Sequence, residues 1–288
     1  MSPDLEQLRA LVAVVDTGSF DAAARVLHVT PSAVSQRIKA LEQSAGQVLV
    51  RRSRPVAPTD AGRAYLRLAR AIDSLVAETA VELESSAVTT LPLAVNADSL
   101  DTWVLPALAA VSDRVCFDLR REDQADTAAL LRDGTVVAAI TSEATAVQGC
   151  RATPLGTMTY RPAATPDVVD RWFPDGPAAS SLGRAPVVVF DRRDRLQDDY
   201  LALHGVTEDP PRHHVPASRA FLDAVLLGLG WGMLPAVQLD EHLGTGALVA
   251  LDDHHVAVDL YWQQWSLRTA PLEATAAAIR SAAAAVLV

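Results

Sequence analysis

Along the first 46 residues, apolar side chains recur every three or four positions, which is the spacing of helices that bury one face. Leu5, Leu8, Val12 and Val15 follow this spacing, and Gly18 comes shortly after them. Glycine is common just past the end of a helix because it adopts the left-handed conformation without strain. The pattern therefore predicts a first helix that ends near Gly18.

A second and a third helix are predicted within "FDAAARVLHVTPSAVSQRIKALEQ", residues 20–43. Ser19 can cap the second helix, and Thr30 can cap the third, with Pro31 at its first position. Proline is favourable there because the N–H that it lacks has no partner within the helix. Gly46 is the expected end of the third helix. Two short helices joined by a tight turn are typical of a helix-turn-helix motif.

On a helical wheel, the third helix has an apolar side formed by Val34, Ile38 and Leu41. The opposite side carries polar and basic side chains, namely Ser32, Gln36, Lys39 and Gln43. Hydroxyls, amides and cations can read base edges in a major groove, which is wide enough to admit one helix. We therefore predict that this side contacts DNA. A small helical bundle with a solvated face is the alternative.

The stretch "VLVRRSRPVAPT", residues 48–59, predicts two short strands around an arginine-rich turn. Guanidinium groups at the tip of such a wing can lie along the phosphates of a duplex. A solvated run of charge is the alternative. The predicted DNA contacts are Ser32, Gln36 and Lys39 on base edges, Ser35 and Arg37 beside them, Pro31 at the start of the helix, and Thr30, Arg51, Arg52 and Arg54 on phosphates.

A long helix is predicted from Thr59 to about Glu84. Its apolar or small positions alternate in steps of three and four, as in a coiled-coil seam: Tyr65, Leu68, Ile72, Leu75 and Thr79. An isolated helix cannot bury such a stripe, so we expect a second copy of the chain to cover it. The alternative is that the stripe packs against the C-terminal part of the same chain.

The segment from "FDAAARVLHV" to "APTDAG", residues 20–62, resembles the N-terminus of the LysR-type transcriptional regulators. It has their Ala-Ala pair, their Pro-Ser-Ala-Val-Ser turn and helix, their Ile-x-x-Leu-Glu, and an Arg-rich wing that ends in Thr-x-x-Gly. The resemblance implies a winged helix-turn-helix (1–62), a linker helix (63–88) that forms a dimer or tetramer, and a C-terminal effector-binding domain (89–288). RNA polymerase is a candidate further partner.

After the polar segment "SSAVTTLP", strand-like runs alternate with helical ones, which predicts an α/β fold with a parallel sheet flanked by helices. A second alternating set follows, and "VAVDLYWQQW" predicts a long strand that returns to the first set. We expect two subdomains with a cleft between them, as in periplasmic binding proteins. Subdomain I is predicted at 89–161 and 268–288, and subdomain II at 162–267.

The C-terminal part is also similar to LysR-type effector domains. "GLGWGMLP" (228–235) and "LLRDGTVVAAI" (130–140) match their motifs, although Val136 and Val137 stand where many members carry Asp. "LAVNADSLDTWVLPAL", "RWFPDG" and "APVVVFD" look closer still to one branch, the regulators of lysine and arginine export. This resemblance implies a lysine or arginine effector and an amino-acid exporter gene as the target.

Ligands of open α/β sheets bind beyond the carboxyl ends of the strands. Acids and hydroxyls at these ends could hold the charged groups of an amino acid, and a buried cationic side chain requires an acid nearby. Asp98 could instead be a helix N-cap, and any one acid could be a solvated loop residue. The candidate effector-binding residues are Asp98, Ser99, Glu122, Asp123, Thr141, Ser142, Glu143, Asp191 and Ser218.

Charge is divided unevenly along the chain, whose net charge is −10. Residues 1–64 hold eight basic and six acidic side chains, so the remainder carries −12. A basic N-terminal part beside an acidic remainder fits a chain in which only the N-terminal part meets DNA.

We expect a cytoplasmic protein without a membrane partner. No apolar run reaches the roughly 18 residues that span a bilayer, and the N-terminus has acids where a signal peptide has bases. The two cysteines, Cys116 and Cys150, are too few for a disulfide framework.

The sequence also argues against an enzyme, because it has no nucleophile elbow, Walker sequence or dinucleotide fingerprint. The pairs His213-His214 and His254-His255 lie on or near predicted strands, where adjacent side chains point to opposite faces, so neither pair makes a chelate. We expect no metal and no cofactor. The alternative function is a cytosolic solute-binding or enzyme domain fused to a helical interaction module.

Overall fold

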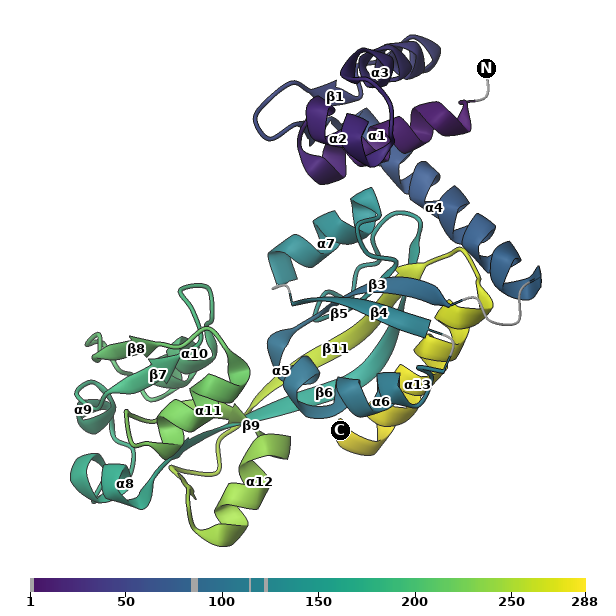
Figure 1. Ribbon diagram of the computed structural model, residues 1–288. Helices are drawn as coiled ribbons and strands as arrows, with labels where there is room; N and C mark the ends of the chain where they lie inside the picture. The colour runs from purple at the N-terminus through teal and green to yellow at the C-terminus, as the bar shows by residue number, and fades with distance from the viewer. Residues whose placement is uncertain (1–2, 84–87, 114, 122–123) are drawn as a thin grey trace.

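The computed structural model describes residues 3–83, 88–113, 115–121 and 124–288. Its N-terminal head contains three helices, a two-stranded wing and the start of a long linker helix (Figure 1). The elements are α1 (Leu5–Thr17), α2 (Phe20–Val26), α3 (Pro31–Ala45), β1 (Val50–Arg51), β2 (Ala57–Pro58) and α4 (Asp60–Leu83). The predicted helix-turn-helix and wing are therefore confirmed as elements of the fold.

Local signals set the helix ends in the head. The hydroxyl of Ser19 caps α2, and the hydroxyl of Thr30 accepts a hydrogen bond from the N–H of Ala33 in α3 at 3.2 Å. Gly18 and Gly46 end α1 and α3 in the left-handed conformation, with φ of 67° and 68°. These caps lie where the sequence places them.

One apolar core holds the head together and includes the beginning of the linker helix. Val34, Ile38 and Leu41 of α3 are completely buried against α1, and Leu66 of α4 joins the same cluster. Because α4 contributes to this core, the head and the linker helix pack as one body.

Part of the predicted seam on the linker helix packs against the head, and part of it is exposed to solvent. Tyr65 and Ile72 pack against the core of the head, whereas Leu68 and Leu75 stay exposed, at 42% and 43% of their surface. Val76, which the heptad pattern leaves out of the seam, is also exposed. The apolar surface open to a second chain is therefore narrower than the sequence predicts and includes Val76.

An arginine of the linker helix ties the head to the effector domain. Arg70 donates to the backbone oxygen of Asp133 at 2.8 Å and to the hydroxyl of Thr135 at 3.1 Å, and it pairs with Asp16 of α1. One turn earlier, Arg67 donates to the backbone oxygen of Gln148 at 2.8 Å. We call these contacts the arginine clamp.

A glycine allows the linker helix to pack closely against the C-terminal domain. Gly134 has φ of 79°, and a Cβ added there would lie 2.7 Å from the ring of Trp265 and 3.3 Å from the Cα of Arg67. A larger residue would therefore force α4 and Trp265 apart.

The central sheet has the strand order β10-β6-β11-β5-β3-β4, and β9 also pairs with β6. Its strands are β3 (Thr89–Val95), β4 (Val115–Arg121), β5 (Ala138–Thr141), β6 (Cys150–Ala164), β9 (Gly232–Pro235), β10 (Val249–Ala250) and β11 (Val256–Trp265). β3 is parallel to β4 and β5, as predicted, but β11 is antiparallel to both β5 and β6. The parallel order predicted for the first set of strands is therefore found, and the returning strand β11 adds antiparallel pairing that the prediction did not specify.

The first lobe is built on β3, β4, β5 and the adjoining parts of β6 and β11. Its helical segments are α5 (Ala97–Ser99), a π-helical turn (Leu100–Val104), α6 (Leu105–Ala109), α7 (Gln124–Asp133) and α13 (Ala270–Val286). α13 packs against α6 and β6, and α7 contacts the linker helix.

The second lobe lies at the far ends of β6 and β11, which link the two lobes (Figure 1). It contains α8 (Pro166–Trp172), α9 (Ala179–Leu182), β7 (Val187–Val189), α10 (Leu196–Leu203), β8 (Arg212–His214), α11 (Ser218–Leu226) and α12 (Ala236–Thr245), together with β9 and β10. The residue numbers at which one subdomain passes into the other remain a prediction.

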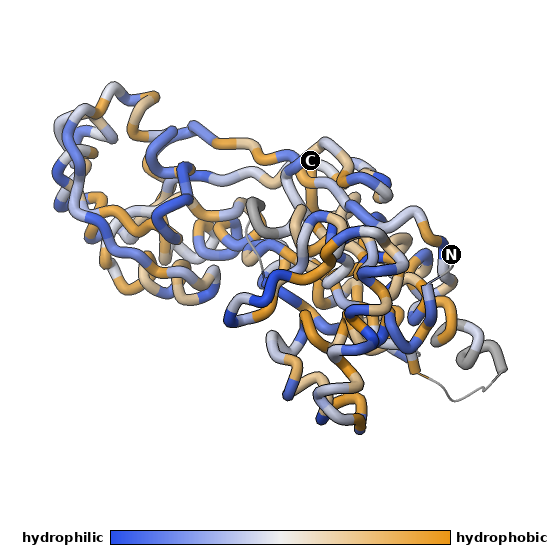
Figure 2. Tube along the Cα trace, turned by 90° about the horizontal axis from the view of Figure 1, so that it is seen from above, coloured by the Kyte–Doolittle hydropathy of each residue, from blue (hydrophilic) through white to orange (hydrophobic). Residues whose placement is uncertain are grey.

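Hydrophobic stretches appear as short pieces between hydrophilic ones along the trace (Figure 2). Among the residues that the structure describes, no helix combines the length and the apolar character needed to cross a bilayer.

Candidate functional site

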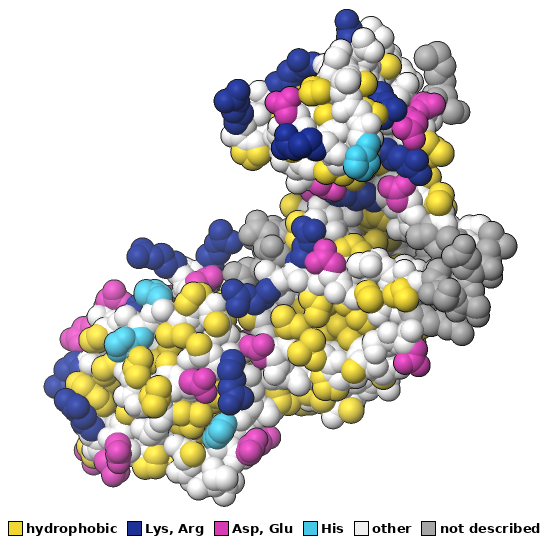
Figure 3. Space-filling view, viewed as in Figure 1, with side chains coloured by type: hydrophobic (Ala, Val, Ile, Leu, Met, Phe, Trp, Pro, Cys, Tyr) yellow, Lys and Arg dark blue, Asp and Glu magenta, His cyan; other side chains and the backbone are white. Residues whose placement is uncertain are grey.

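The outer face of α3 is open to solvent. Ser32, Gln36 and Lys39 are exposed, and Ser35 is half-buried beside them. This placement is what a recognition helix requires, because the apolar side of α3 is used up by the core while the polar side stays free. Basic side chains gather around the outer edge of the head (Figure 3).

Arg37, beside the exposed face of α3, makes an ion pair within the head. Its guanidinium pairs with the carboxylate of Glu6 at 3.1 Å and is only 28% exposed. The side chain therefore joins α3 to α1, and its predicted place beside the base contacts stays a prediction.

The wing presents its arginines on the surface. Arg51, Arg52 and Arg54 are all exposed. Arg51 donates to the backbone oxygen of Pro58 at 3.2 Å, and the guanidinium of Arg52 lies 5.4 Å from the centre of the Phe20 ring. The first contact holds Arg51 against β2, and the second places Arg52 near the start of α2. Pro31 is exposed, and Thr30 is exposed with its hydroxyl engaged as the cap of α3.

A cavity of about 600 Å³ lies between the two lobes. Six of the predicted effector residues line it, namely Asp98, Thr141, Ser142, Glu143, Asp191 and Ser218. Ser99 does not line it. One position after Asp98 along the helix, the side chain of Ser99 points into the interior and is completely buried. That prediction is corrected. Glu122 and Asp123 lie outside the residues that the structure describes.

Asp98 joins the two lobes across this cavity. Its carboxylate accepts hydrogen bonds from the hydroxyls of Tyr160 at 2.7 Å and Ser218 at 2.6 Å. The alternative that Asp98 is an N-cap is wrong, because Asn96 occupies that position. Burial raises the pKa of Asp98, the two hydrogen bonds oppose this rise, and the charge of Asp101 adds to it.

Asp101 makes a second link between the lobes. Its carboxylate accepts the backbone N–H of Arg219, at the start of α11, at 3.1 Å. Asp98 and Asp101 thus both reach from the first lobe to α11 of the second.

Asp194 is a cavity residue that the sequence prediction missed. Its carboxylate accepts the backbone N–H groups of Phe190 at 3.2 Å and Leu196 at 3.0 Å. Burial raises the pKa of Asp194, these hydrogen bonds oppose the rise, and the charges of Asp98 and Asp191 add to it. The run "DRRDR" after β7 contains two acids, and the prediction chose Asp191, whose carboxylate accepts the N–H of Asp194 at 3.0 Å and so serves the turn.

Two further polar side chains in the cavity were also missed. Tyr160, on the long strand β6, is buried, and its hydroxyl touches Asp98. The side-chain oxygen of Gln238 is buried without a hydrogen-bond partner among the described residues. A buried acceptor of this kind suits a ligand that brings an N–H donor. No local pattern in the sequence marks either residue.

A helix-turn-helix head with a free recognition face, a linker helix and a two-lobed domain with a charged cavity define a ligand-responsive DNA-binding regulator. Two family models match the chain: the bacterial regulatory helix-turn-helix protein, lysR family, at residues 5–63, and the LysR substrate binding domain at residues 85–284. The chain belongs to the LysR family of transcription regulators.

Full-length relatives match over nearly the whole chain. The lysine export transcriptional regulatory protein LysG of Corynebacterium glutamicum is 39% identical over 284 residues, which cover 96% of this chain and 97% of the relative. The crystal structure of ArgP from Mycobacterium tuberculosis is 43% identical, with a TM-score of 0.91 over 98% of this chain and 97% of that one. The structure of full-length LysG from C. glutamicum with bound effector Arg is 38% identical, with a TM-score of 0.84 over 99% of each chain.

Proposed function

We propose that this regulator senses a basic amino acid, arginine or lysine, in the cavity between its lobes and controls a gene for amino-acid export. The observation that carries the proposal is the pair of largely buried acids, Asp98 and Asp194, which face one cavity. Two such carboxylates repel each other, and a cationic ligand relieves both the repulsion and the cost of burying their charge. The arginine in the relative from C. glutamicum supports the same ligand class.

Calorimetry of the purified full-length protein tests the ligand class. We expect binding heat with arginine or lysine and none with citrulline, which has the length of arginine but an uncharged side chain. Equal heats for all three, or no heat with any of them, would contradict the proposal.

We further propose that the head binds operator DNA in the cytoplasm, as a dimer or tetramer joined through α4, and that the protein acts by binding and not by catalysis. The exposed Leu68, Leu75 and Val76 support the joint, because together they leave an apolar strip on the linker helix. The basic wing and the free polar face of α3 support the DNA contacts.

Gln36→Ala should weaken binding to the operator by about 1–3 kcal/mol and leave binding to random DNA nearly unchanged, as expected for the loss of a bidentate base contact. Arg52→Ala is the matched comparison, since a lost phosphate contact weakens both kinds of DNA alike and reduces the salt slope by about 1. Fluorescence anisotropy with both DNAs at several salt concentrations separates the two effects. If the two variants exchanged behaviours, the assignment of helix and wing would be wrong.

Arginine affinity should fall as the pH is lowered. The cationic ligand prefers ionised Asp98 and Asp194, and burial raises the pKa of each carboxyl, so protonation competes with the ligand at a higher pH than it would at an exposed aspartate. Calorimetry between pH 8 and pH 5 should show the loss, and Asp98→Asn should flatten it. An affinity that stays constant or rises toward pH 5 would contradict the role of these acids.

A further inference from the structure

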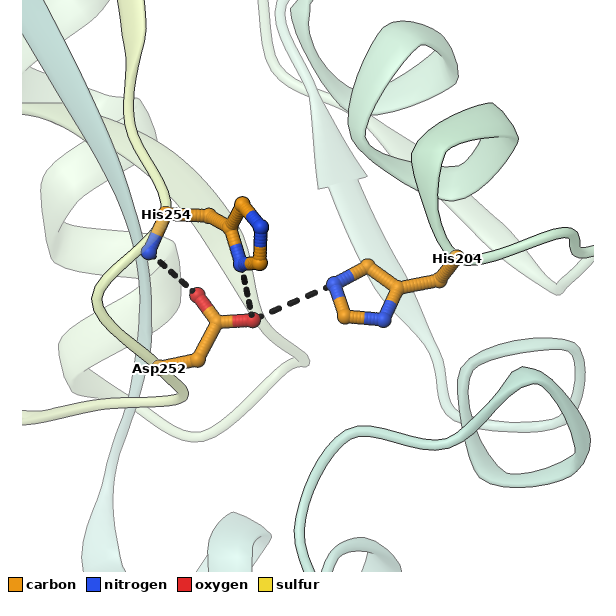
Figure 4. Close-up of side chains that lie close together, drawn as sticks. All are labelled: His204, Asp252 and His254. Carbon is orange, nitrogen blue, oxygen red and sulfur yellow. Dashed lines mark hydrogen bonds and ion pairs between the residues drawn. The ribbon is translucent and has the colours of Figure 1, made fainter.

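Three side chains outside the effector cavity converge on one point in the second lobe (Figure 4). His204 lies directly after α10, while Asp252 and His254 lie in the loop between β10 and β11. The residues are up to 50 positions apart in sequence, and the fold brings them together. None of them lines the cavity between the lobes.

Both histidine rings point at the same carboxylate oxygen. Nε2 of His204 lies 3.1 Å and Nδ1 of His254 lies 3.2 Å from Oδ2 of Asp252. In a tetrahedral site with bonds of 2.0–2.1 Å, neighbouring ligand atoms are about 3.3 Å apart. The two nitrogen–oxygen distances are therefore already those of ligand atoms around one small ion.

Bringing the two imidazole nitrogens to the spacing of metal ligands requires little movement. All three ligand atoms lie within 4.8 Å of one another. The His254 side chain is 54% exposed and can turn toward His204, whose own side chain is only 17% exposed and is held against the ring of Tyr200. One anchored and one adjustable imidazole can close on an ion.

Two further hydrogen bonds orient the carboxylate of Asp252. The hydroxyl of Tyr200 donates to Oδ2 at 2.7 Å, and the backbone N–H of His254 donates to Oδ1 at 2.9 Å. Hydrogen bonds of this kind fix the direction of a ligating carboxylate.

We propose that His204, Asp252 and His254 bind one divalent transition-metal ion of the Zn²⁺ class. Two imidazoles and one carboxylate form a donor set that suits such ions, and the exposed side of His254 leaves a fourth position for water. Each ring ligates as the neutral tautomer that carries its proton on the other nitrogen. The proposal departs from the sequence-based expectation of no metal, because it pairs His254 with the distant His204 and not with the adjacent His255.

The place of the site gives the ion a mechanical role. Leu196 and Asp199, in the first half of α10, line the cavity between the lobes, and His204 follows the other end of this helix. Asp252 and His254 stand just before β11, a strand that links the two lobes. A bound ion fastens the helix to the loop that leads into this linking strand.

Titration of the chelator-treated full-length protein with ZnCl₂ in a calorimeter tests the site. We expect one ion per chain with micromolar or tighter affinity, and a loss of at least about tenfold in His204→Gln and in Asp252→Asn. His255→Gln is the matched control, since it removes an exposed imidazole from the same loop and should leave the affinity unchanged. Thermal melting in EDTA checks that the variants remain folded.

Cobalt provides a readout that does not depend on stability. Co²⁺ held by these side chains should give the intense visible bands of a four-coordinate ion, and His204→Gln should remove them. The proposal is overturned if the wild-type protein binds no Zn²⁺ in the micromolar range, or if His204→Gln and Asp252→Asn bind it as tightly as His255→Gln does. In those cases the three side chains form a hydrogen-bonded network only.

Discussion

Asp98→Asn should lower the affinity for arginine by about 2–5 kcal/mol, which corresponds to a factor of about 30 to several thousand in Kd. Removing one partner of a buried, hydrogen-bonded charge pair leaves the ligand's cation without compensation in a low-dielectric cavity. Asparagine has nearly the same shape as aspartate, so the cavity should keep its form.

Asp98→Asn should also weaken the contact between the lobes. The carboxylate of Asp98 accepts hydrogen bonds from both Tyr160 and Ser218, and an asparagine has only one acceptor oxygen for these two hydroxyls. We therefore expect a weaker link between the lobes in addition to the weaker ligand contact.

Calorimetry with arginine measures the effect, and Asp240→Asn on α12 is the control, because it removes an exposed carboxylate from the same lobe as Ser218. We expect the control to bind arginine as the unmodified protein does. A Kd for Asp98→Asn within a factor of three of that of the control would show that Asp98 does not face the ligand's charge.

Leu75→Glu should separate the dimer and reduce operator affinity by about 10²–10⁴. Leu75 is 43% exposed on α4, and a buried carboxylate in the seam between two copies would lack a partner. Two linked heads bind two half-sites with a high effective concentration, and a single head loses that advantage while keeping its own contacts.

Analytical ultracentrifugation and gel shifts with a whole operator and a half-site should show these two outcomes together. Leu227→Glu is the control, because Leu227 is an exposed leucine at the end of α11, away from the linker helix. The proposed joint would be wrong if Leu75→Glu sedimented as the control does, or if half-site affinity fell as much as whole-operator affinity.

The head could be predicted closely because its signals are local. Caps such as Ser19 and Thr30, and the end at Gly46, act within one helical turn, so their residue types alone indicate the boundaries. The same is true of the exposed face of α3, which follows from the period of 3.6 residues.

The two-lobed domain was harder to predict because its long strand β6 lacks the usual sequence pattern of a strand. β6 reads "CRATPLGTMTYRPAA", with two prolines and a glycine where a strand usually has none. The sheet accommodates Gly156 opposite Leu260, beside the register shift between Leu260 and Tyr261, and a Cβ added at Gly156 would lie 2.8 Å from Leu287. Only the packed structure explains these residues.

Side chains that meet across long sequence distances were missed for a similar reason. Tyr160 meets Asp98 from 62 positions away, and His204 meets Asp252 from 48 positions away. Short-range spacing carries no information on such pairs, so the sequence could indicate strand ends and a cleft but not which acids would become buried in it.

The arginine clamp joins the head to the first lobe of the same chain. Arg70 holds α1, the linker helix and the first lobe together, whereas the second lobe is tied to the first through Asp98, which lines the cavity, and through Asp101. A ligand in the cavity can therefore act on the link between the lobes more directly than on the joint between the head and the first lobe. In an oligomer, a movement of the second lobe would then reach the heads through contacts between subunits.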